Sequence, residues 1–411
     1  MTELSSAERR LLDDAADAPM LAQVERWSAI NSGSRNLVGL ARMADELADA
    51  FSVLPGDARL LEADAAEAVQ PDGTVTPVAY GRHLHLSVRP DAPIRILLTG
   101  HMDTVFPQDH GFQHPRWTGP GILNGPGAAD MKGGLAVMLA ALRAIERSDA
   151  ATRIGYEVVI NSDEEVGSPS SATLLRHAAA GKGAAFTYEP AMPDGTLAGA
   201  RAGSGNFSII VAGRSAHAGR NPDEGRNALL AAADLALRLK AGSGDGFSCN
   251  PAKIDGGGPN NVVPDHAVLR VNFRPRTPMD ETAARALIER TMADVARAHD
   301  VTLHLHGGFG RPPKILDENA ERLFALVRQC GADLGLSVGW RDTGGVCDGN
   351  NIAACGVPVV DTMGVRGGNI HSDAEFLLTD SLPERARLSA LAIWRIAHGQ
   401  FSTIEERGSG F

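Results

Sequence analysis

Hydrophobic and polar residues alternate along this chain in two periods, one typical of helices and one typical of strands. Helical periodicity marks 20–30, 36–51 and 132–147, and strand-like stretches lie at 76–88, 94–100 and 155–161. Because elements of the two kinds follow one another, the pattern predicts an α/β fold in which helices flank a mixed, largely parallel sheet.

The pattern changes between about 201 and 311. It predicts a strand at 207–212, a helix at 227–240, strands at 247–254 and 267–273, a helix at 280–299 and a strand at 301–305. This order is that of a ferredoxin-like α+β unit. Strand and helix alternation resumes afterwards, so we expect an inserted lid domain at 202–311 and a catalytic domain formed by 1–201 and 312–411. The chemistry is expected in the cleft between the two domains.

Composition and charge narrow the class of protein. A chain of 411 residues exceeds one ordinary core, which agrees with two domains. Lys and Arg number 39 against 50 Asp and Glu, a net charge of −11, which argues against nucleic-acid binding. No apolar stretch approaches the roughly 18 residues that cross a bilayer. The N-terminus is acidic where a signal peptide would be basic, and the four cysteines show no CxxC spacing. We therefore expect a cytoplasmic protein with reduced thiols and no membrane partner.

Candidate chemistry begins where the strand at 94–100 ends. His101 and Asp103 follow its apolar residues, at the carboxyl edge where open α/β sheets place their ligands. Side chains two residues apart in an extended chain point the same way, which brings Asp103 to the imidazole of His101. A carboxylate on one ring nitrogen makes the other a better metal ligand. The alternative interpretation is a polar pair that simply closes a strand.

Five further acidic or imidazole side chains follow probable strands or precede a helix. Asp130 lies in a glycine-rich loop before the helix at 132–147, where it can also be a simple helix cap. Glu164 and Glu165 are adjacent, so one can bind a metal while the other takes a proton from water; the alternative is a solvated acidic turn. Glu189 and His371 complete the set.

Together these positions supply two imidazoles and several carboxylates. Such a mixture suits two zinc ions, with cobalt or manganese as substitutes. The combination predicts a two-metal site, whereas each cluster alone is weak evidence.

From His101 to His371 the chain resembles the co-catalytic metallopeptidase family that includes glutamate carboxypeptidase, aminoacylase, acetylornithine deacetylase and succinyl-diaminopimelate desuccinylase. The segments at 101–107 and 124–134 resemble the glutamate carboxypeptidase branch most. The resemblance implies that His101 and Glu189 hold one metal, that Glu165 and His371 hold the other, and that Asp130 bridges them. It further implies Glu164 as general base, Asp103 as the residue that orients His101, and a cis peptide bond after Asp130.

The resemblance extends to the lid. The segment at 213–219 is similar to the family segment whose histidine reaches the active site of a partner subunit, which implies a homodimer through the lid with His217 acting in trans. Asn261, Arg274 and Arg311 occupy positions similar to substrate-binding ones, and arginine suits a carboxylate. Cys347 stands where the family usually has Ser or Thr, so its part in substrate binding is open.

The predicted function is a di-metal hydrolase, or metallopeptidase, that cleaves an amide bond beside a carboxylate, with an N-acyl amino acid or peptide as substrate. An N-acyl amino-acid deacylase is the alternative within the same chemistry. A non-catalytic relative that binds metal or peptides is a third hypothesis, against which Glu164 counts, because a binding module needs no general base.

Overall fold

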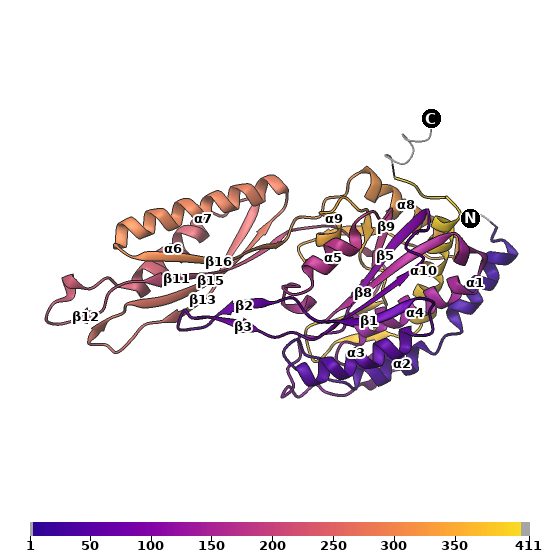
Figure 1. Ribbon diagram of the computed structural model, residues 1–411, viewed down its shortest axis with the longest axis horizontal. Coiled ribbons are helices and arrows are strands. Elements are labelled where there is room, and N and C mark those ends of the chain that lie inside the picture. Colours follow the sequence, from indigo (N-terminus) through magenta and orange to yellow (C-terminus); the bar gives the residue numbers. More distant parts are fainter. Residues whose placement is uncertain (1–2, 404–411) are drawn as a thin grey trace.

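The computed structural model describes residues 3–403. Figure 1 shows a larger domain of stacked helices and strands, from which a smaller, elongated domain extends to the left. The two domains have separate hydrophobic cores. No helix of the described part of the chain is long and apolar enough to span a bilayer.

A six-stranded sheet forms the centre of the larger domain. Its strands, in spatial order, are β1 (Asp57–Leu61), β4 (His83–Val88), β8 (Ile154–Asn161), β5 (Ile94–His101), β9 (Ala184–Thr187) and β18 (Val359–Val360). The last four are parallel to one another, and β1 and β4 join as an antiparallel edge. The predicted mixed, largely parallel sheet is confirmed, and its central strands are buried on both faces, as continuous apolar runs require.

Helices cover both faces of this sheet (Figure 1). One face carries α1 (Ser6–Ala16), α2 (Met20–Ser28), α4 (Gly133–Glu146) and α10 (Ser381–Ala397), among which α4 is buried along most of its length. On the other face, α5 (Ala172–Ala179) and α9 (Asp348–Ala353) pack over a small apolar cluster. The remaining helices of this domain are α3 (Leu37–Phe51) and α8 (Glu318–Asp333).

Short sheets complete the larger domain. They are formed by β2 (Ala66–Val69) with β3 (Val75–Val78), by β10 (Leu197–Arg201) with β17 (Trp340–Thr343), and by β19 (Gly367–Gly368), β20 (Phe376–Leu378), β7 (Ile122–Asn124) and β6 (Arg116–Gly119) in that order. The last of these sheets joins the loop before α4 to the loop that contains His371, two segments far apart in the sequence.

The smaller domain, called the lid below, is an antiparallel sheet with two helices on one face (Figure 1). The sheet order is β13 (Phe247–Gly256), β15 (His266–Pro275), β11 (Ser204–Ala212) and β16 (Thr302–Arg311). The helices are α6 (Ala228–Ala241) and α7 (Pro278–His299), and a short pair, β12 (Ala216–His217) with β14 (Val262–Val263), lies at the far end. The β-α-β-β-α-β order agrees with the predicted ferredoxin-like unit.

Two local predictions differ from the structure. The stretch expected as one strand at 76–88 is divided between β3 and β4, because the chain leaves one small sheet and enters the large one. The strand expected at 301–305 continues as β16 to Arg311. This extension matters because it brings the end of the lid sheet to the cleft.

Candidate metal centre

A cavity of about 780 Å³ lies between the two domains. The larger domain contributes Asp130, Glu165, Glu189 and His371 to its wall, and the lid contributes Arg274. Its acidic residues come from different loops that follow strands of the large sheet or precede α4. Parallel strands end at the same edge, so these loops meet there although the sequence separates them widely.

His101 is the last residue of β5 and is almost completely buried. Its Nδ1 lies 3.0 Å from the backbone oxygen and 3.4 Å from Oδ1 of Asp103. Its Nε2 faces Asp130 Oδ1 at 3.1 Å and Glu189 Oε1 at 3.8 Å. A hydrogen bond from Nδ1 to the backbone oxygen of Asp103 leaves Nε2 available to a metal. The sequence predicted the Asp103 carboxylate in this place, and that carboxylate lies slightly farther from Nδ1.

Asp130 lies between the two histidines. Its Oδ1 approaches His101, and its Oδ2 is 3.3 Å from His371 Nε2. The carboxylate thus presents one oxygen to each side of the centre, as a bridging ligand does. The peptide bond between Asp130 and Met131 is cis, as the resemblance implied.

Glu375 holds the loop around Asp130 in place. It is 1% exposed, its Oε1 accepts hydrogen bonds from the backbone N–H groups of Ala129 and Asp130, and its Oε2 accepts one from Gly127. Gly127 has a φ of 70°, a conformation that glycine adopts without steric cost. The sequence analysis missed Glu375, since nothing in its local pattern separates it from a surface carboxylate.

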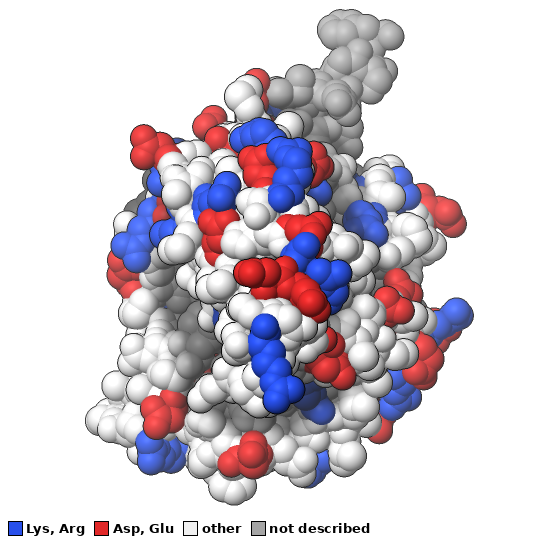
Figure 2. Space-filling model, turned by 90° about the vertical axis from the view of Figure 1, so that its left-hand side faces the viewer, with Lys and Arg blue, Asp and Glu red and all other residues white. Residues whose placement is uncertain are grey.

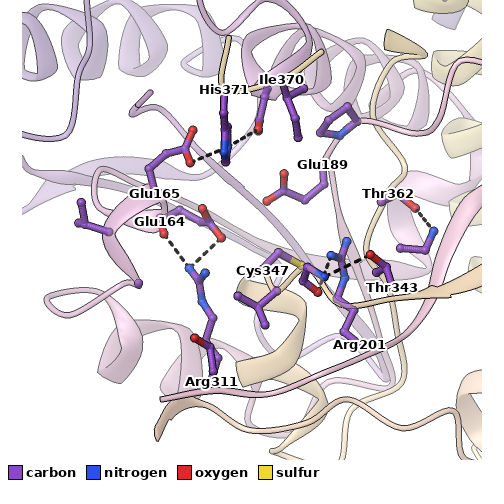
Figure 3. Close-up of a pocket in the computed structure, with 18 of the residues that line it drawn as sticks. Glu164, Glu165, Glu189, Arg201, Arg311, Thr343, Cys347, Thr362, Ile370 and His371 are labelled. Carbon is purple, nitrogen blue, oxygen red and sulfur yellow. Dashed lines mark hydrogen bonds and ion pairs between the residues drawn. The ribbon is translucent and has the colours of Figure 1, made fainter. Parts of the chain in front are cut away.

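Glu164 and Glu165 follow β8 in a single turn of 3₁₀-helix. Asp103 fixes this turn, because its two carboxylate oxygens accept the N–H groups of Glu164 and Glu165 at 3.2 Å each. Asp103 therefore orients both His101 and the acidic turn. Glu165 Oε2 lies 3.1 Å from His371 Nε2, while Glu164 turns to Arg311 (Figure 3).

Glu189 reaches the centre from the loop after β9. The start of α4 packs against this loop so closely that a Cβ at Gly134 would lie 2.0 Å from the carbonyl oxygen of Tyr188. Only glycine permits this approach. The glycines around Asp130 thus serve packing of the helix against the strand end that carries Glu189.

Several buried carboxyl groups lie close together in the centre, and their negative charges favour the binding of cations. Burial raises the pKa of Glu164 to about 7 and that of Glu165 to about 8, and it also raises the pKa of Glu189. Hydrogen bonds to Asp130 and Glu165 raise the pKa of His371 to about 11. Burial alone would lower the pKa of His101, but the charge of Glu189 and bonds to Asp103 and Asp130 raise it. Without metal, protons on the imidazoles balance the carboxylates.

The donor set fits divalent metal ions. Ligand atoms of His101, Asp130 and Glu165 form one compact group, and those of His101, Glu164 and Glu189 form another. Imidazole and carboxylate donors are those that zinc, cobalt and manganese accept. Metal binding at such a site displaces protons from the imidazoles and takes over their role in balancing the carboxylates.

The structure brings together the five predicted metal ligands, Glu164 and Asp103, but it separates the predicted lid residues. Arg274 lines the cavity, and Arg311 does so at 6% exposure. His217 and Asn261 lie at the far end of the lid, near β12 and β14, where Ala218 N donates to Asn261 O (Figure 1). Within one subunit neither contributes to the cavity wall.

A second buried cluster borders the cavity and was missed by the sequence analysis. Asp361 accepts hydrogen bonds from Arg201 Nε at 2.7 Å and Lys314 Nζ at 2.8 Å, and Cys347 Sγ lies 3.5 Å from it. Figure 3 shows Arg201 and Cys347 of this cluster beside each other at the cavity wall. The Cys347 sulfur also accepts the N–H of Gly349 at the start of α9. Burial raises the pKa of the Cys347 thiol well above its usual range, and by its contacts the residue caps α9.

Fold and donor set define a metal-dependent hydrolase, and comparison with known proteins identifies its family. The chain belongs to the peptidase family M20/M25/M40, whose family model matches residues 97–395. It is 29% identical to carboxypeptidase G2 of Pseudomonas sp. (strain RS-16) over 314 residues, 74% of each chain. It is also 29% identical to a succinyl-diaminopimelate desuccinylase of Verminephrobacter eiseniae (strain EF01-2), over 69% of this chain and 74% of that one.

A solved structure shares the fold. A dinuclear metal-binding peptidase of this family from Bacillus subtilis superimposes with a TM-score of 0.63 at 14% identity, over 92% of this chain and 98% of that one. The protein is therefore an M20-type metallohydrolase, a peptidase or amidohydrolase, and the binding of a metal pair is typical of its family.

Proposed function

We propose that this enzyme hydrolyses an amide bond adjacent to a carboxylate, in the manner of a glutamate carboxypeptidase. The observation that carries the proposal is the composition of the cavity, where a cluster of metal-binding side chains faces a cationic lid residue. Arg274 donates through Nε to Asn272 Oδ1, and no carboxylate of residues 3–403 lies within ion-pair distance of it. Burial and the charge of Arg311 lower the pKa of Arg274. A substrate carboxylate would relieve both effects.

The chain's own residues supply the remaining steps. We assign His101 and Glu189 to one zinc ion, Glu165 and His371 to the other, and Asp130 to both. When bound, the metals act as Lewis acids that polarise the scissile carbonyl and promote ionisation of water. Glu164 takes a proton from the attacking water at its carboxylate and returns it to the leaving amine. A carboxyl group whose pKa is raised towards neutrality by burial suits both transfers.

A homodimer completes the proposed site. His217 is exposed at the far end of the lid, so its proposed role as donor to the carbonyl oxygen requires a second subunit. Helix α6 supports such an assembly. Leu230 and Leu237 lie about two turns apart on one side of this helix, and their side chains are 60% and 71% exposed. The neighbouring strand β13 forms an edge of the lid sheet. Apolar residues beside an open strand edge favour pairing of two lids.

An N-acyl amino-acid deacylase remains the second candidate, since the similarity to a desuccinylase is comparable in identity to that with the carboxypeptidase. Both reactions need the same metals and a carboxylate site. The test is amine release by the zinc-loaded enzyme from a panel of N-acetyl, N-succinyl and N-benzoyl amino acids and folate, with and without chelator. Preference for folate or benzoyl-glutamate supports the carboxypeptidase, and preference for acetyl or succinyl substrates supports the deacylase. No turnover across the panel with zinc bound would favour a non-catalytic binding protein.

A further inference from the structure

The chain crosses between the two domains at two segments that lie side by side. The first leads from Arg201 to β11, and the second leads from Arg311 to Lys314. They are joined by hydrogen bonds between the backbones of Arg201 and Lys314 at 2.9 and 3.0 Å. Asn350 Nδ2 at the start of α9 donates to the carbonyls of Ala202 and Pro312 at 2.9 and 2.8 Å. Any movement of the lid therefore pivots at this pair of segments.

Arg311 is the last residue of the lid strand β16, yet its side chain belongs to the larger domain. Nη2 lies 2.7 Å from Glu164 Oε1 and donates to the backbone oxygen of Glu164 at 2.8 Å. The same nitrogen lies 3.0 Å from Ser168 Oγ and 3.4 Å from Asp348 Oδ1. Figure 3 shows the guanidinium reaching Glu164 from the side opposite His371. A residue at the pivot thus contacts the proposed general base directly.

Arg311 is also the cation that forms an ion pair with the Glu164 carboxylate. Among the described residues, no other hydrogen-bond donor or cation lies within bonding distance of the Glu164 side-chain oxygens. Glu165 differs, because His371 holds it. A glutamate side chain without a partner samples several rotamers. The Glu164 carboxylate lies close to His101 and Glu189, and its one ion pair among the described residues comes from Arg311 at the lid crossing.

We propose that Arg311 is a positioning residue that orients Glu164 for proton transfer and couples this orientation to the position of the lid. The proposal rests on the proposed function in so far as Glu164 is the base. It replaces the substrate-binding role that the sequence analysis gave to Arg311 and leaves the substrate carboxylate to Arg274. The competing role has one observation in its favour. Nε of Arg311 is buried and has no acceptor among residues 3–403, so binding of a substrate carboxylate at this nitrogen must be tested against positioning.

The kinetic test compares two arginines of one cavity, in the zinc-loaded enzyme with the panel member that is hydrolysed fastest. For Arg311→Met we expect kcat to fall about 10²-fold with KM little changed, because a misplaced base slows the chemical step. Arg311→Lys should recover part of kcat. The matched control Arg274→Met should raise KM and leave kcat nearly intact, which is the effect of lost ground-state binding. A rise in KM with unchanged kcat in Arg311→Met would overturn the proposal in favour of substrate binding.

A second measurement separates positioning from general loss of structure. If Arg311 acts through Glu164, the residual rate of Glu164→Ala/Arg311→Met equals that of Glu164→Ala, whereas independent roles would add. Zinc content and thermal unfolding of each variant identify those that fail to fold, and the charge-conserving Arg311→Lys remains available in that case.

A third experiment, crystallography of a variant, does not depend on whether the enzyme turns over any substrate of the panel. In zinc-loaded crystals of Arg311→Met the Glu164 carboxylate should be displaced or present in several orientations, and an unmoved carboxylate would refute the positioning role. Absence of turnover across the panel would reject the proposed function alone, because the orientation of Glu164 would still decide the role of Arg311.

Discussion

Glu164 and Glu165 are neighbours in the chain but have different surroundings. The carboxylate of Glu165 approaches His371 and belongs to the same ligand group as Asp130, while that of Glu164 approaches Arg311 and belongs to the group with Glu189. Both residues lie in one turn, which is held by hydrogen bonds from the N–H groups of Glu164 and Glu165 to the Asp103 carboxylate. One turn of chain therefore delivers two carboxylates that can serve as a base and as a ligand.

This division predicts opposite outcomes for two equivalent substitutions. Glu164→Gln keeps the shape of the side chain but cannot take a proton, so we expect the zinc content of the wild type and a loss of about 10²–10⁴-fold in kcat. Glu165→Gln should instead lower the zinc content. Metal analysis after dialysis and kcat on the same samples make the comparison. Loss of zinc from Glu164→Gln with retention in Glu165→Gln would show that the two roles are reversed.

Glu375 provides a test of how the loop that carries Asp130 is held. Replacement by Gln exchanges one acceptor oxygen for an N–H₂ group that faces backbone donors, so the loop around Asp130 loses part of its support. We expect zinc affinity to fall about 10–100-fold, as is usual for residues that support metal ligands. Competition with a zinc chelator measures it. The exposed Glu318→Gln serves as control, and equal affinities in the two variants would contradict the supporting role.

Helices and strands were predicted correctly where their buried faces follow the hydrophobic period of the sequence. The buried strands β5 and β8, the helix α4 and the order of the lid elements agree with prediction. Helix α1 was missed although Ser5 and Glu8 form a capping box at its start, because the segment was considered only as a possible signal peptide. Strand β16 was predicted too short, since glycines at 307, 308 and 310 interrupt its pattern.

The same distinction applies to the site. His101, Asp130 and the glutamates each stand beside an element that the pattern reveals, so their meeting at one edge could be predicted from topology. Arg201 and Glu375 could not, because their contacts join segments that only the folded chain brings together. The contact of Arg311 with Glu164 spans 147 residues. This contact depends on how the two domains are connected, and the hydrophobic pattern of neighbouring residues carries no information about that.

A buried network of ion pairs joins helices α1 and α10, and we expect it to contribute to the stability of the fold. Arg395 lies 3.2 Å from Glu8 and 2.8 Å from Asp333, with its own side chain 6% exposed. Arg395→Ala removes the cation that faces two buried carboxylates, and we expect it to lower the free energy of unfolding by about 3–5 kcal/mol. The exposed pair of Arg238 with Asp234 supplies the control, where Arg238→Ala should cost less than about 0.5 kcal/mol. Urea denaturation measures both.

The pH dependence of this difference follows from Glu8. Burial opposes ionisation, but hydrogen bonds from Ser5 and the charge of Arg395 outweigh it and lower the pKa of Glu8 below its ordinary 4.5. A depressed carboxyl pKa stabilises the folded state above the unfolded value and ceases to do so as pH falls through the folded value. The difference between wild type and Arg395→Ala should therefore shrink below pH 4.5. A difference that grows in acid would exclude Glu8 as the partner.

At the scale of the whole molecule, the lid contacts the larger domain away from the pivot as well. The hairpin of β2 and β3 reaches the open face of the lid sheet (Figure 1), where Arg270 Nη2 donates to Val69 O at 2.9 Å. His266 Nε2 lies 3.2 Å from Pro71 O. The lid is thus held at its base and along one face, and its far end with β12 is left free to meet another molecule.

The surface at that end is compatible with self-association. Figure 2 views the molecule from the lid end, and Lys and Arg are interspersed there with Asp and Glu. Despite a net charge of −11 for the whole chain, this face carries no single-sign field that would repel a second copy. Mixed charges and the exposed leucines of α6 together favour a symmetric pair.

A mixed dimer tests both the assembly and the role of His217 in one experiment. His217→Ala should fold and bind zinc but lose about 10²–10³-fold in kcat, as expected for removal of one donor to the carbonyl oxygen. Glu164→Ala is inactive through its own site. When the two variants are unfolded, mixed and refolded together, half of the dimers are hybrids, and in each hybrid one site combines an intact Glu164 with an intact His217 from the partner. Activity should then return to about a quarter of the wild-type value, since random pairing makes half the dimers hybrid with one working site each. Each variant refolded alone is the control. If His217 acted within its own subunit, mixing would restore nothing, because every site would still lack one of the two groups.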